Sequence, residues 1–243
     1  MRKKIYFFVS GTDTGVGKTL ITGLLARYFR ENKFNVITQK WVETGAGRGN
    51  CSNDILEHIK LSGASFDLYK SFLEWMSPYL LKYPASPHLS AKLENKNISV
   101  KKIERAFNIL KENFDVVICE GAGGLFVPIN KKYMMIDICG KLGIPVLLVS
   151  ENRLGAINQT ILSIEALRTR KIPILGIILN QVDKKQKELV LKNNPRVIKE
   201  LGRAVILGSL PYSSDKKILY PLFSRSRIGD SIIKEYRKIY GNR

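Results

Sequence analysis

A glycine-rich segment that ends in a lysine and a threonine is the strongest chemical signal in the chain. It reads Gly11-Thr-Asp-Thr-Gly-Val-Gly-Lys-Thr19 and follows the apolar run Ile5–Val9. Glycines between a strand and a helix let backbone N–H groups surround a phosphate, and the helix dipole favours the negative charge. The lysine can reach the β- and γ-phosphates, and the threonine hydroxyl can hold Mg²⁺. The segment therefore predicts a P-loop in which Lys18 and Thr19 have these roles.

A carboxylate and several glycines follow another apolar run, Val116–Cys119, in the order Glu120-Gly-Ala-Gly-Gly124. The carboxyl ends of parallel strands meet at one edge of a sheet, so Glu120 can complete a metal shell beside the P-loop. The glycines either let a substrate approach the bare backbone or form only a turn, and the residues alone leave both interpretations open.

Two further polar residues have an ambiguous pattern when each is taken alone. Lys40 follows the run Val36–Thr38 and could stabilise a transferring phosphoryl group, although an exposed structural lysine fits the isolated residue better. Asp54, in Asn53-Asp54-Ile55, has the pattern of a helix cap. A functional role for either residue therefore depends on a wider pattern.

Alternating strands and helices must position these residues. Continuous apolar runs, typical of strands buried on both faces of a parallel sheet, lie at 5–9, 36–38, 116–119, 145–149, 172–179 and 205–210. Helices are predicted at 18–32, 99–113 with a Ser99 cap, 156–170, and 184–201 with an interruption near Pro195. The pattern predicts a doubly wound α/β fold, with a mostly parallel sheet and helices on both faces. We expect a single P-loop NTPase-like domain over residues 1–243, with 212–243 as a C-terminal appendage.

The composition, 44% apolar and 25% charged residues, is that of a globular protein. Cys51, Cys119 and Cys139 form neither a metal-ligand spacing nor an even disulfide framework, which fits a reducing cytoplasm. No apolar run approaches the roughly 18 residues of a membrane span, and the one after Met1-Arg-Lys-Lys is too short for a secretion signal. We therefore expect a cytoplasmic protein that does not enter the membrane.

An excess of positive charge has two interpretations. The chain has 40 Lys and Arg against 21 Asp and Glu, a net charge of +19, and residues 184–243 hold 15 basic and 5 acidic residues. Nucleic-acid binding would use such a surface, but no nucleic-acid-binding motif accompanies it. A uniformly basic surface without a specific role is the preferred interpretation, and nucleic acid is not expected as a partner.

Together these elements resemble the dethiobiotin synthetase family, ATP-dependent enzymes that close the ureido ring in biotin synthesis. The general pattern Gly-x₄-Gly-Lys would need a glycine where this chain has Thr12, and the longer spacing from Gly11 resembles that family's own P-loop variant. The likeness continues in order over about 170 residues of the chain. Its other anchors are Lys40 with Thr44-Gly45, Asn53-Asp54, Pro84-Ala-Ser-Pro-His88, Glu120-Gly-Ala-Gly-Gly124, Leu154-Gly-Ala-Ile-Asn158 and Asn180.

The resemblance implies ligands for particular residues. ATP would be bound by Asp13, Thr14, Gly15, Val16, Gly17, Lys18 and Thr19, with Asn180 at the adenine. Mg²⁺ would be bound by Thr19, Asp54 and Glu120, which makes Asp54 a ligand rather than a cap. The catalytic residues would be Lys18, Lys40 and Thr14. The substrate 7,8-diaminononanoate would contact Lys40, Thr44, Gly121, Gly124 and Asn158, the last across the interface of a homodimer.

The implied reaction needs positioning and charge neutralisation rather than a protein nucleophile. One amine takes up CO₂ to form a carbamate, the carbamate attacks the γ-phosphate of ATP, and the second amine then displaces phosphate and closes the ring. The sequence has no evident Ser-His-Asp or Cys-His set, which agrees with this scheme. His58, in a helical stretch, and His88, in a loop, are expected to be structural.

The chain departs from the family pattern at several positions. Gly15 stands where some members carry Glu, Thr44 replaces a common Ser, and Trp41 occupies a position often taken by Pro. Asn180-Gln-Val-Asp replaces Asn-Asp-Val-Thr, which weakens the base assignment and leaves the preference among ATP, CTP and GTP open. Ser86 and His88 either line the substrate pocket or shape a loop. Residues beyond 212 align with nothing in the family.

Two other classes share the nucleotide-binding architecture. A cobyrinic acid a,c-diamide synthase would need an additional glutaminase domain, for which we expect no room in 243 residues. A partitioning ATPase of the ParA/MinD type would bind DNA or membrane through the basic surface. Such ATPases carry a signature lysine early in the P-loop, where this chain has Asp13. The dethiobiotin synthetase interpretation is therefore favoured.

Overall fold

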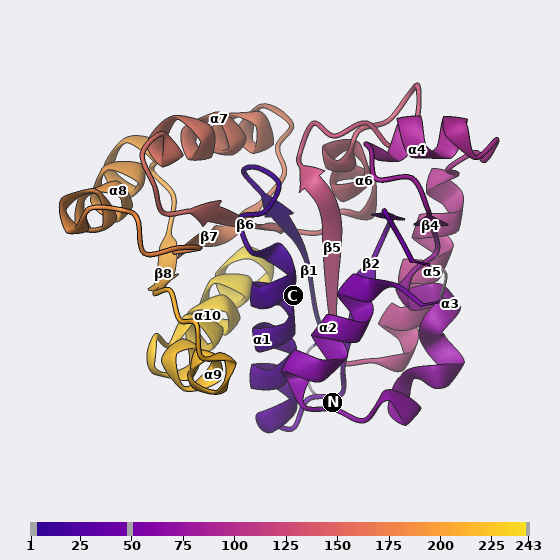
Figure 1. Cartoon of the computed structure of the whole chain (residues 1–243), viewed down its shortest axis with the longest axis horizontal. Coiled ribbons are helices and arrows are strands. Elements are labelled where there is room, and N and C mark those ends of the chain that lie inside the picture. The colour runs from indigo at the N-terminus through magenta and orange to yellow at the C-terminus, as the bar shows by residue number, and fades with distance from the viewer. Residues whose placement is uncertain (1–3, 48–50, 242–243) are drawn as a thin grey trace.

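The computed structural model describes residues 4–47 and 51–241 of the chain. Within these residues, six parallel strands form one sheet in the order β2-β5-β1-β6-β7-β8 (Figure 1). They are β1 (Ile5–Gly11), β2 (Val36–Lys40), β5 (Val116–Gly124), β6 (Val146–Glu151), β7 (Ile174–Asn180) and β8 (Ile206–Leu210). A short parallel pair, β3 (Glu43–Thr44) and β4 (Leu80–Leu81), lies beside the sheet. The α/β fold expected from the apolar runs is confirmed.

Helices cover both faces of the sheet because the central strands are apolar on both sides. On one face pack α1 (Lys18–Glu31), α9 (Lys216–Arg225) and α10 (Ile228–Tyr240). On the other pack α3 (Leu73–Met76), α5 (Val100–Asn113), α6 (Met135–Leu142), α7 (Ala156–Thr169) and α8 (Glu188–Gly202) (Figure 1). Phe7 and Phe8, successive residues of β1, are fully buried in the two different cores. Side chains of a strand alternate between its faces, so one apolar run supplies both layers.

The remaining helices lie in the segment between β3 and α5. They are α2 (Asn53–Ser62), the 3₁₀ helix η1 (Phe66–Phe72) and α4 (Pro87–Leu93). In the part of the chain covered by the structure, no helix is long and apolar enough to cross a membrane.

The C-terminal segment completes one face of the sheet. Phe223 of α9 and Ile232 of α10 are fully buried in the same core as α1. The Tyr28 hydroxyl donates to Asp230 at 2.5 Å, and the backbone N–H of Tyr6 donates to the Tyr236 hydroxyl at 3.2 Å. These contacts join residues some 200 positions apart, so no local sequence pattern could predict them.

The two helix caps suggested by the sequence differ in outcome, because Asp54 is not a cap whereas Ser99 does stand at the N-cap of its helix. The cap of α2 is Ser52, whose hydroxyl accepts from the backbone N–H of Ile55 at 3.1 Å, and Asn53 and Asp54 are already helical. Ser99 stands at the N-cap of α5, but its side chain makes no capping hydrogen bond in the described structure. Its backbone N–H instead donates to the Tyr79 hydroxyl at 2.8 Å.

Helix α8 also differs from its prediction. It begins at Glu188 instead of Lys184 and continues through Pro195 without the predicted interruption. A proline lacks the N–H that would bond to the carbonyl four residues earlier, here that of Leu191. The side-chain amide of Asn152, from the segment after β6, donates to the Leu191 carbonyl at 3.0 Å and replaces the missing donor.

Candidate active site

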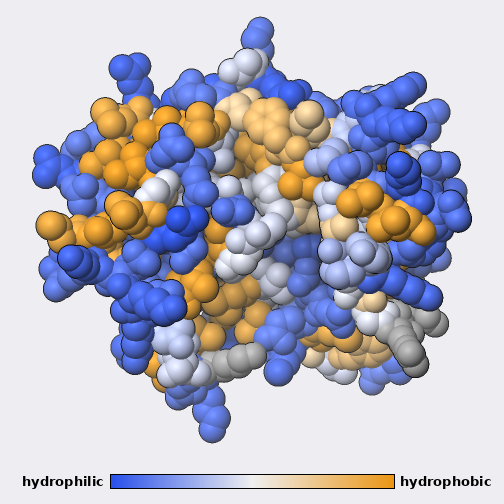
Figure 2. All heavy atoms as spheres, turned by 45° about the horizontal axis from the view of Figure 1, so that its top comes forward, coloured by the Kyte–Doolittle hydropathy of each residue, from blue (hydrophilic) through white to orange (hydrophobic). Residues whose placement is uncertain are grey.

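A cavity of about 230 Å³ lies at the carboxyl ends of β1, β2 and β5. Figure 2 shows hydrophilic side chains in a hollow near the middle of this face, with apolar groups beside it. The cavity is lined by Thr14, Gly15, Lys18, Thr19, Lys40, Val42, Glu43, Thr44, Asp54, Glu120, Ala122 and Gly123. The fold thus brings together most of the site residues predicted from the sequence.

The P-loop turns through two glycines with left-handed backbone angles. Gly15 has a φ of 73° and Gly17 a φ of 94°. A Cβ atom at position 17 would also collide with the side-chain amide of Asn180, so this position requires glycine for two reasons. Helix α1 begins at Lys18, and no side chain in the described residues caps its N-terminus. The N–H groups of its first turn are therefore available to a phosphate.

Lys18 extends over the loop into the cavity. Its side chain is largely buried, and among the described residues Nζ makes only a long contact of 3.4 Å, to the carbonyl of Asp13. Burial lowers the pKa of Lys18, an effect that the negative charge of Glu120 opposes and the positive charge of Lys40 reinforces. An ammonium group held this loosely can reorient toward an incoming anion.

A buried cluster of charges lies beside the P-loop. Nζ of Lys40 is 2.8 Å from Oε1 of Glu120 and 2.5 Å from Oδ2 of Asp54. The Thr19 hydroxyl lies 3.0 Å from Asp54 Oδ1 and 3.1 Å from Glu120 Oε1. Burial alone would raise the pKa of the fully buried Glu120 carboxyl, but Lys40 and His58 outweigh it and hold that pKa well below its usual range. Glu120 is therefore an ionised carboxylate.

The same oxygens fit a divalent cation. Thr19, Asp54 and Glu120 converge within hydrogen-bond distance of one another, and their carboxylates already hold the cationic Lys40. Mg²⁺ prefers hard oxygen ligands and is usually bound through one or two carboxylates together with substrate phosphates. Two carboxylates and a hydroxyl beside a P-loop are a suitable donor set of this kind.

Two residues of the site were missed by the sequence analysis. His58, expected to be structural, places Nε2 2.8 Å from Oε2 of Glu120, and both side chains are completely buried. Its spacing of four from Asp54, which puts the two on one face of α2, is the signal that could have found it. Glu43 accepts the backbone N–H of Asn53 at 2.9 Å and the Ser52 hydroxyl. It thereby anchors the start of the helix that carries Asp54.

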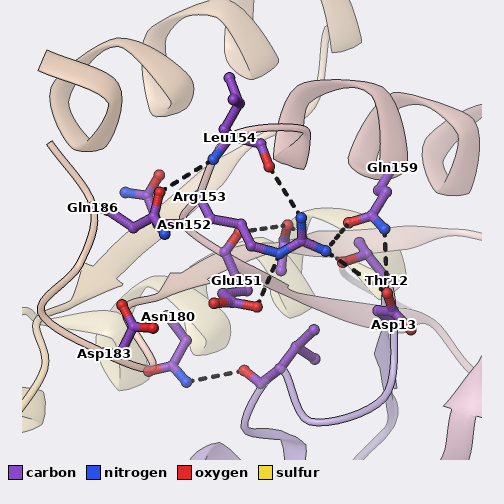
Figure 3. A network of polar contacts seen from close by, with 12 residues as sticks. Thr12, Asp13, Glu151, Asn152, Arg153, Leu154, Gln159, Asn180, Asp183 and Gln186 are labelled. Atoms are coloured by element: carbon purple, nitrogen blue, oxygen red, sulfur yellow. Dashed lines mark hydrogen bonds and ion pairs between the residues drawn. The ribbon is translucent and has the colours of Figure 1, made fainter.

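A polar network joins the other side of the P-loop to the segment after β6 (Figure 3). The Asn180 amide donates to the carbonyl of Val16 at 2.9 Å, so Asn180 holds the P-loop directly. Arg153 donates to Glu151 at 3.0 Å and to Gln159 at 3.2 Å. The Gln159 amide in turn donates at 3.2 Å to Asp13, whose other carboxylate oxygen accepts the Thr14 backbone N–H at 2.7 Å.

The other predicted residues occupy different positions. The carbonyl of Gly121 accepts from Lys40 at 3.1 Å, whereas Gly124 lies at the end of β5, paired with Gly11. Asn158 is exposed on the first turn of α7 and does not line the cavity, within the part of the chain described. The Ser86 hydroxyl lies 3.1 Å from His88 Nδ1 at the start of α4, and His88 lines a separate cleft with Lys92 and Asn130.

Comparisons with known proteins agree with this geometry. A family model described as an AAA domain matches residues 6–217. The ATP-dependent dethiobiotin synthetase BioD of Thermodesulfovibrio yellowstonii is 33% identical over 240 residues, 96% of each chain. The BioD of Halalkalibacterium halodurans is 37% identical over 96% of this chain and 93% of the relative. BioD 2 of Haemophilus influenzae is 42% identical over 77% of this chain and 96% of the relative.

Solved structures with the same fold are more distant in sequence. A ParA protein of pNOB8, bound to nonspecific DNA, has a TM-score of 0.57 and 16% identity, covering 99% of this chain and all of that one. MinD in the MinC:MinD complex of Aquifex aeolicus has a TM-score of 0.55 and 17% identity, covering 98% and 97%. At these identities the likeness shows a shared P-loop NTPase fold and nothing about the reaction.

Proposed function

The chain belongs to the dethiobiotin synthetase family and is an ATP-dependent ligase that forms dethiobiotin, and from this premise we propose how its residues share the reaction. The substrates are 7,8-diaminononanoate, CO₂ and ATP, and the products are dethiobiotin, ADP and phosphate. One observation carries the assignment: the side chains of Lys18, Lys40, Thr19, Asp54 and Glu120 all line one cavity beside a helix N-terminus.

The chemistry proceeds by charge neutralisation at atoms that this cavity brings together. An amine of the substrate adds to CO₂ and loses a proton, giving a carbamate whose negative charge the Lys40 ammonium stabilises. A carbamate oxygen attacks the γ-phosphorus, and ADP leaves while Lys18 offsets the charge of the transferring group. The second amine then attacks the carbonyl carbon of the mixed anhydride, and phosphate departs as the ring closes. Thr14 and Thr44 supply polar contacts at the rim of the cavity, and Asn180 holds the P-loop from the side of the base.

Mg²⁺ is part of this proposal. When bound, the ion supplies positive charge against the phosphate oxygens of ATP, and Thr19, Asp54 and Glu120 would hold it. Two carboxylates that already attract a lysine in the protein support this assignment.

We propose a homodimer in which α7 forms part of the interface. Leu162 on α7 is 61% exposed and lies one helical turn after Asn158, and Leu154 in the turn before α7 is 79% exposed. Figure 2 shows apolar side chains gathered where α7 and α8 lie. Burial of such a patch against a second copy would place Asn158 near the partner's substrate. We further propose that the whole chain works as one catalytic domain and that it acts in the cytoplasm, where its free cysteines stay reduced.

Asn158→Ala is expected to raise the KM for the diamine by about tenfold, because it removes a hydrogen bond to the charged carboxylate of that substrate. The KM for ATP is expected to stay unchanged. Steady-state kinetics with each substrate varied in turn would measure the difference. Thr169→Ala, at the far end of the same helix, is the matched control. An unchanged diamine KM would show that Asn158 does not bind the carboxylate end of the substrate.

The reaction itself is tested by mass spectrometry. The protein is incubated with 7,8-diaminononanoate, bicarbonate, Mg²⁺ and ATP, and each component is left out in turn. Dethiobiotin that depends on all four supports the proposal. ATP hydrolysis by folded protein without any dethiobiotin would retain the P-loop and refute the substrate.

A further inference from the structure

We propose that His58 is a positioning residue of the active site, which orients the Glu120 carboxylate so that Oε1 faces the phosphate and cation. This inference deepens the proposed function and rests on the role of Glu120 given there. The sequence offered only a structural role for this histidine.

The contacts of Glu120 divide cleanly between its two oxygens. Oε1 receives Lys40 at 2.8 Å and Thr19 at 3.1 Å, both from the cavity side. Oε2 receives His58 Nε2 at 2.8 Å, from helix α2. Because an ionised carboxylate can only accept, the hydrogen of this bond lies on Nε2 of His58. The histidine therefore fixes the rotation of the carboxylate about its last bond.

Removal of the His58 donor would leave Oε2 of Glu120 without its hydrogen-bond partner. Both side chains are fully buried, so an apolar side chain of similar volume at position 58 would leave Oε2 without a donor. Oε2 would then compete with Oε1 for Lys40 and Thr19, and the carboxylate would lose its single orientation. Partners that orient a metal-binding carboxylate are typically worth about 10- to 100-fold in metal affinity or activity.

The far side of the histidine lies against hydroxyl groups as well as the apolar Ala26, Val36 and Ile59. His58 Nδ1 is buried and has no hydrogen-bond partner among the residues that the structure describes. His58 lines a small cavity of about 10 Å³ together with Thr38, Ser62 and Tyr69, each of which has a hydroxyl group. That volume suits one water molecule. If His58 only filled the core, leucine would fill the same space without burying a polar ring nitrogen.

The test compares His58→Leu, which removes the donor at similar volume, with His58→Gln, whose amide restores an N–H. Mn²⁺ binding in the presence of ADP is measured by electron paramagnetic resonance, and thermal unfolding is recorded beside it. We expect a 10- to 100-fold weaker Mn²⁺ affinity for His58→Leu and recovery of most of it by His58→Gln. Ile55→Val, at a buried position of the same helix, is the control for packing, with unchanged Mn²⁺ affinity.

The wild-type protein provides a second readout that does not depend on the folding of His58→Leu. The chain has two histidines, so ¹⁵N-labelled imidazole signals can be assigned with His88→Gln. Mg²⁺ and ADP are expected to shift the Nε2 signal of His58 and leave that of His88 in place. Wild-type Mn²⁺ affinity in His58→Leu, or an unmoved His58 signal at saturating Mg²⁺ and ADP, overturns the inference. Dethiobiotin formation by the wild type, measured separately, shows whether the proposed function still stands in that case.

Discussion

Lys18→Ala is expected to lower kcat for dethiobiotin formation by about a thousandfold or more. The ammonium is the only side-chain charge that residues 11–19 direct into the cavity, because the Asp13 carboxylate lies against Gln159 and Arg153 instead. A charge that offsets a transferring phosphoryl group in a site shielded from water is worth about 10²- to 10⁵-fold in rate. Stopped assays with mass-spectrometric detection of dethiobiotin would measure the loss.

The fold should survive this change. Lys18 makes no ion pair within the described residues, and its 3.4 Å contact with the Asp13 carbonyl is long for a hydrogen bond. The thermal unfolding midpoint is therefore expected to stay close to that of the wild type. Lys101→Ala, an exposed lysine on α5, is the matched control and should keep full activity. Turnover within tenfold of the wild type in folded Lys18→Ala would refute the P-loop assignment.

Glu120→Gln is expected to lower the free energy of unfolding by about 3 kcal/mol. Removing one partner of a buried ion pair typically costs about 3–5 kcal/mol, because the other charge is left buried without compensation. Here Asp54 remains 2.5 Å from Lys40, which places the expected loss at the lower end of that range. Urea unfolding at pH 7 would measure it.

The pH dependence gives the same substitution a second signature. Lys40 and His58 hold the pKa of the folded Glu120 carboxyl well below the value of about 4.3 for an unfolded glutamate. The stabilisation is therefore complete above about pH 4.3, and is lost as the pH falls from there toward the folded-state pKa. Wild-type stability should decline more steeply below pH 4 than that of Glu120→Gln.

A double substitution measures the coupling between Lys40 and Glu120. Lys40→Met combined with Glu120→Gln removes both charges, and is expected to be less destabilising than the sum of the single changes. Two results together would show that Lys40 and Glu120 are not coupled in the folded protein. The first is an equal decline of stability below pH 4 in the wild type and Glu120→Gln, and the second is strict additivity in the double variant.

Local sequence patterns determined the sheet and the P-loop. A strand buried on both faces must be continuously apolar, so runs such as Ile5–Val9 and Val116–Cys119 identified central parallel strands before any contact was known. The loop from Gly11 to Thr19 was equally readable, because Gly15 and Gly17 have left-handed backbone angles that glycine adopts readily. Parallel topology then placed Lys40 and Glu120 at one edge.

The tertiary structure alone decided which of these polar groups meet. His58 and Glu120 are 62 positions apart, Lys40 and Glu120 are 80 apart, and Asn152 supports Pro195 from another element. A helix pattern states which residues share a face but not which side chain of a distant strand lies opposite that face. Burial then gives such a meeting its energy, since a charge or donor removed from water is stabilised only by the partner that the fold supplies.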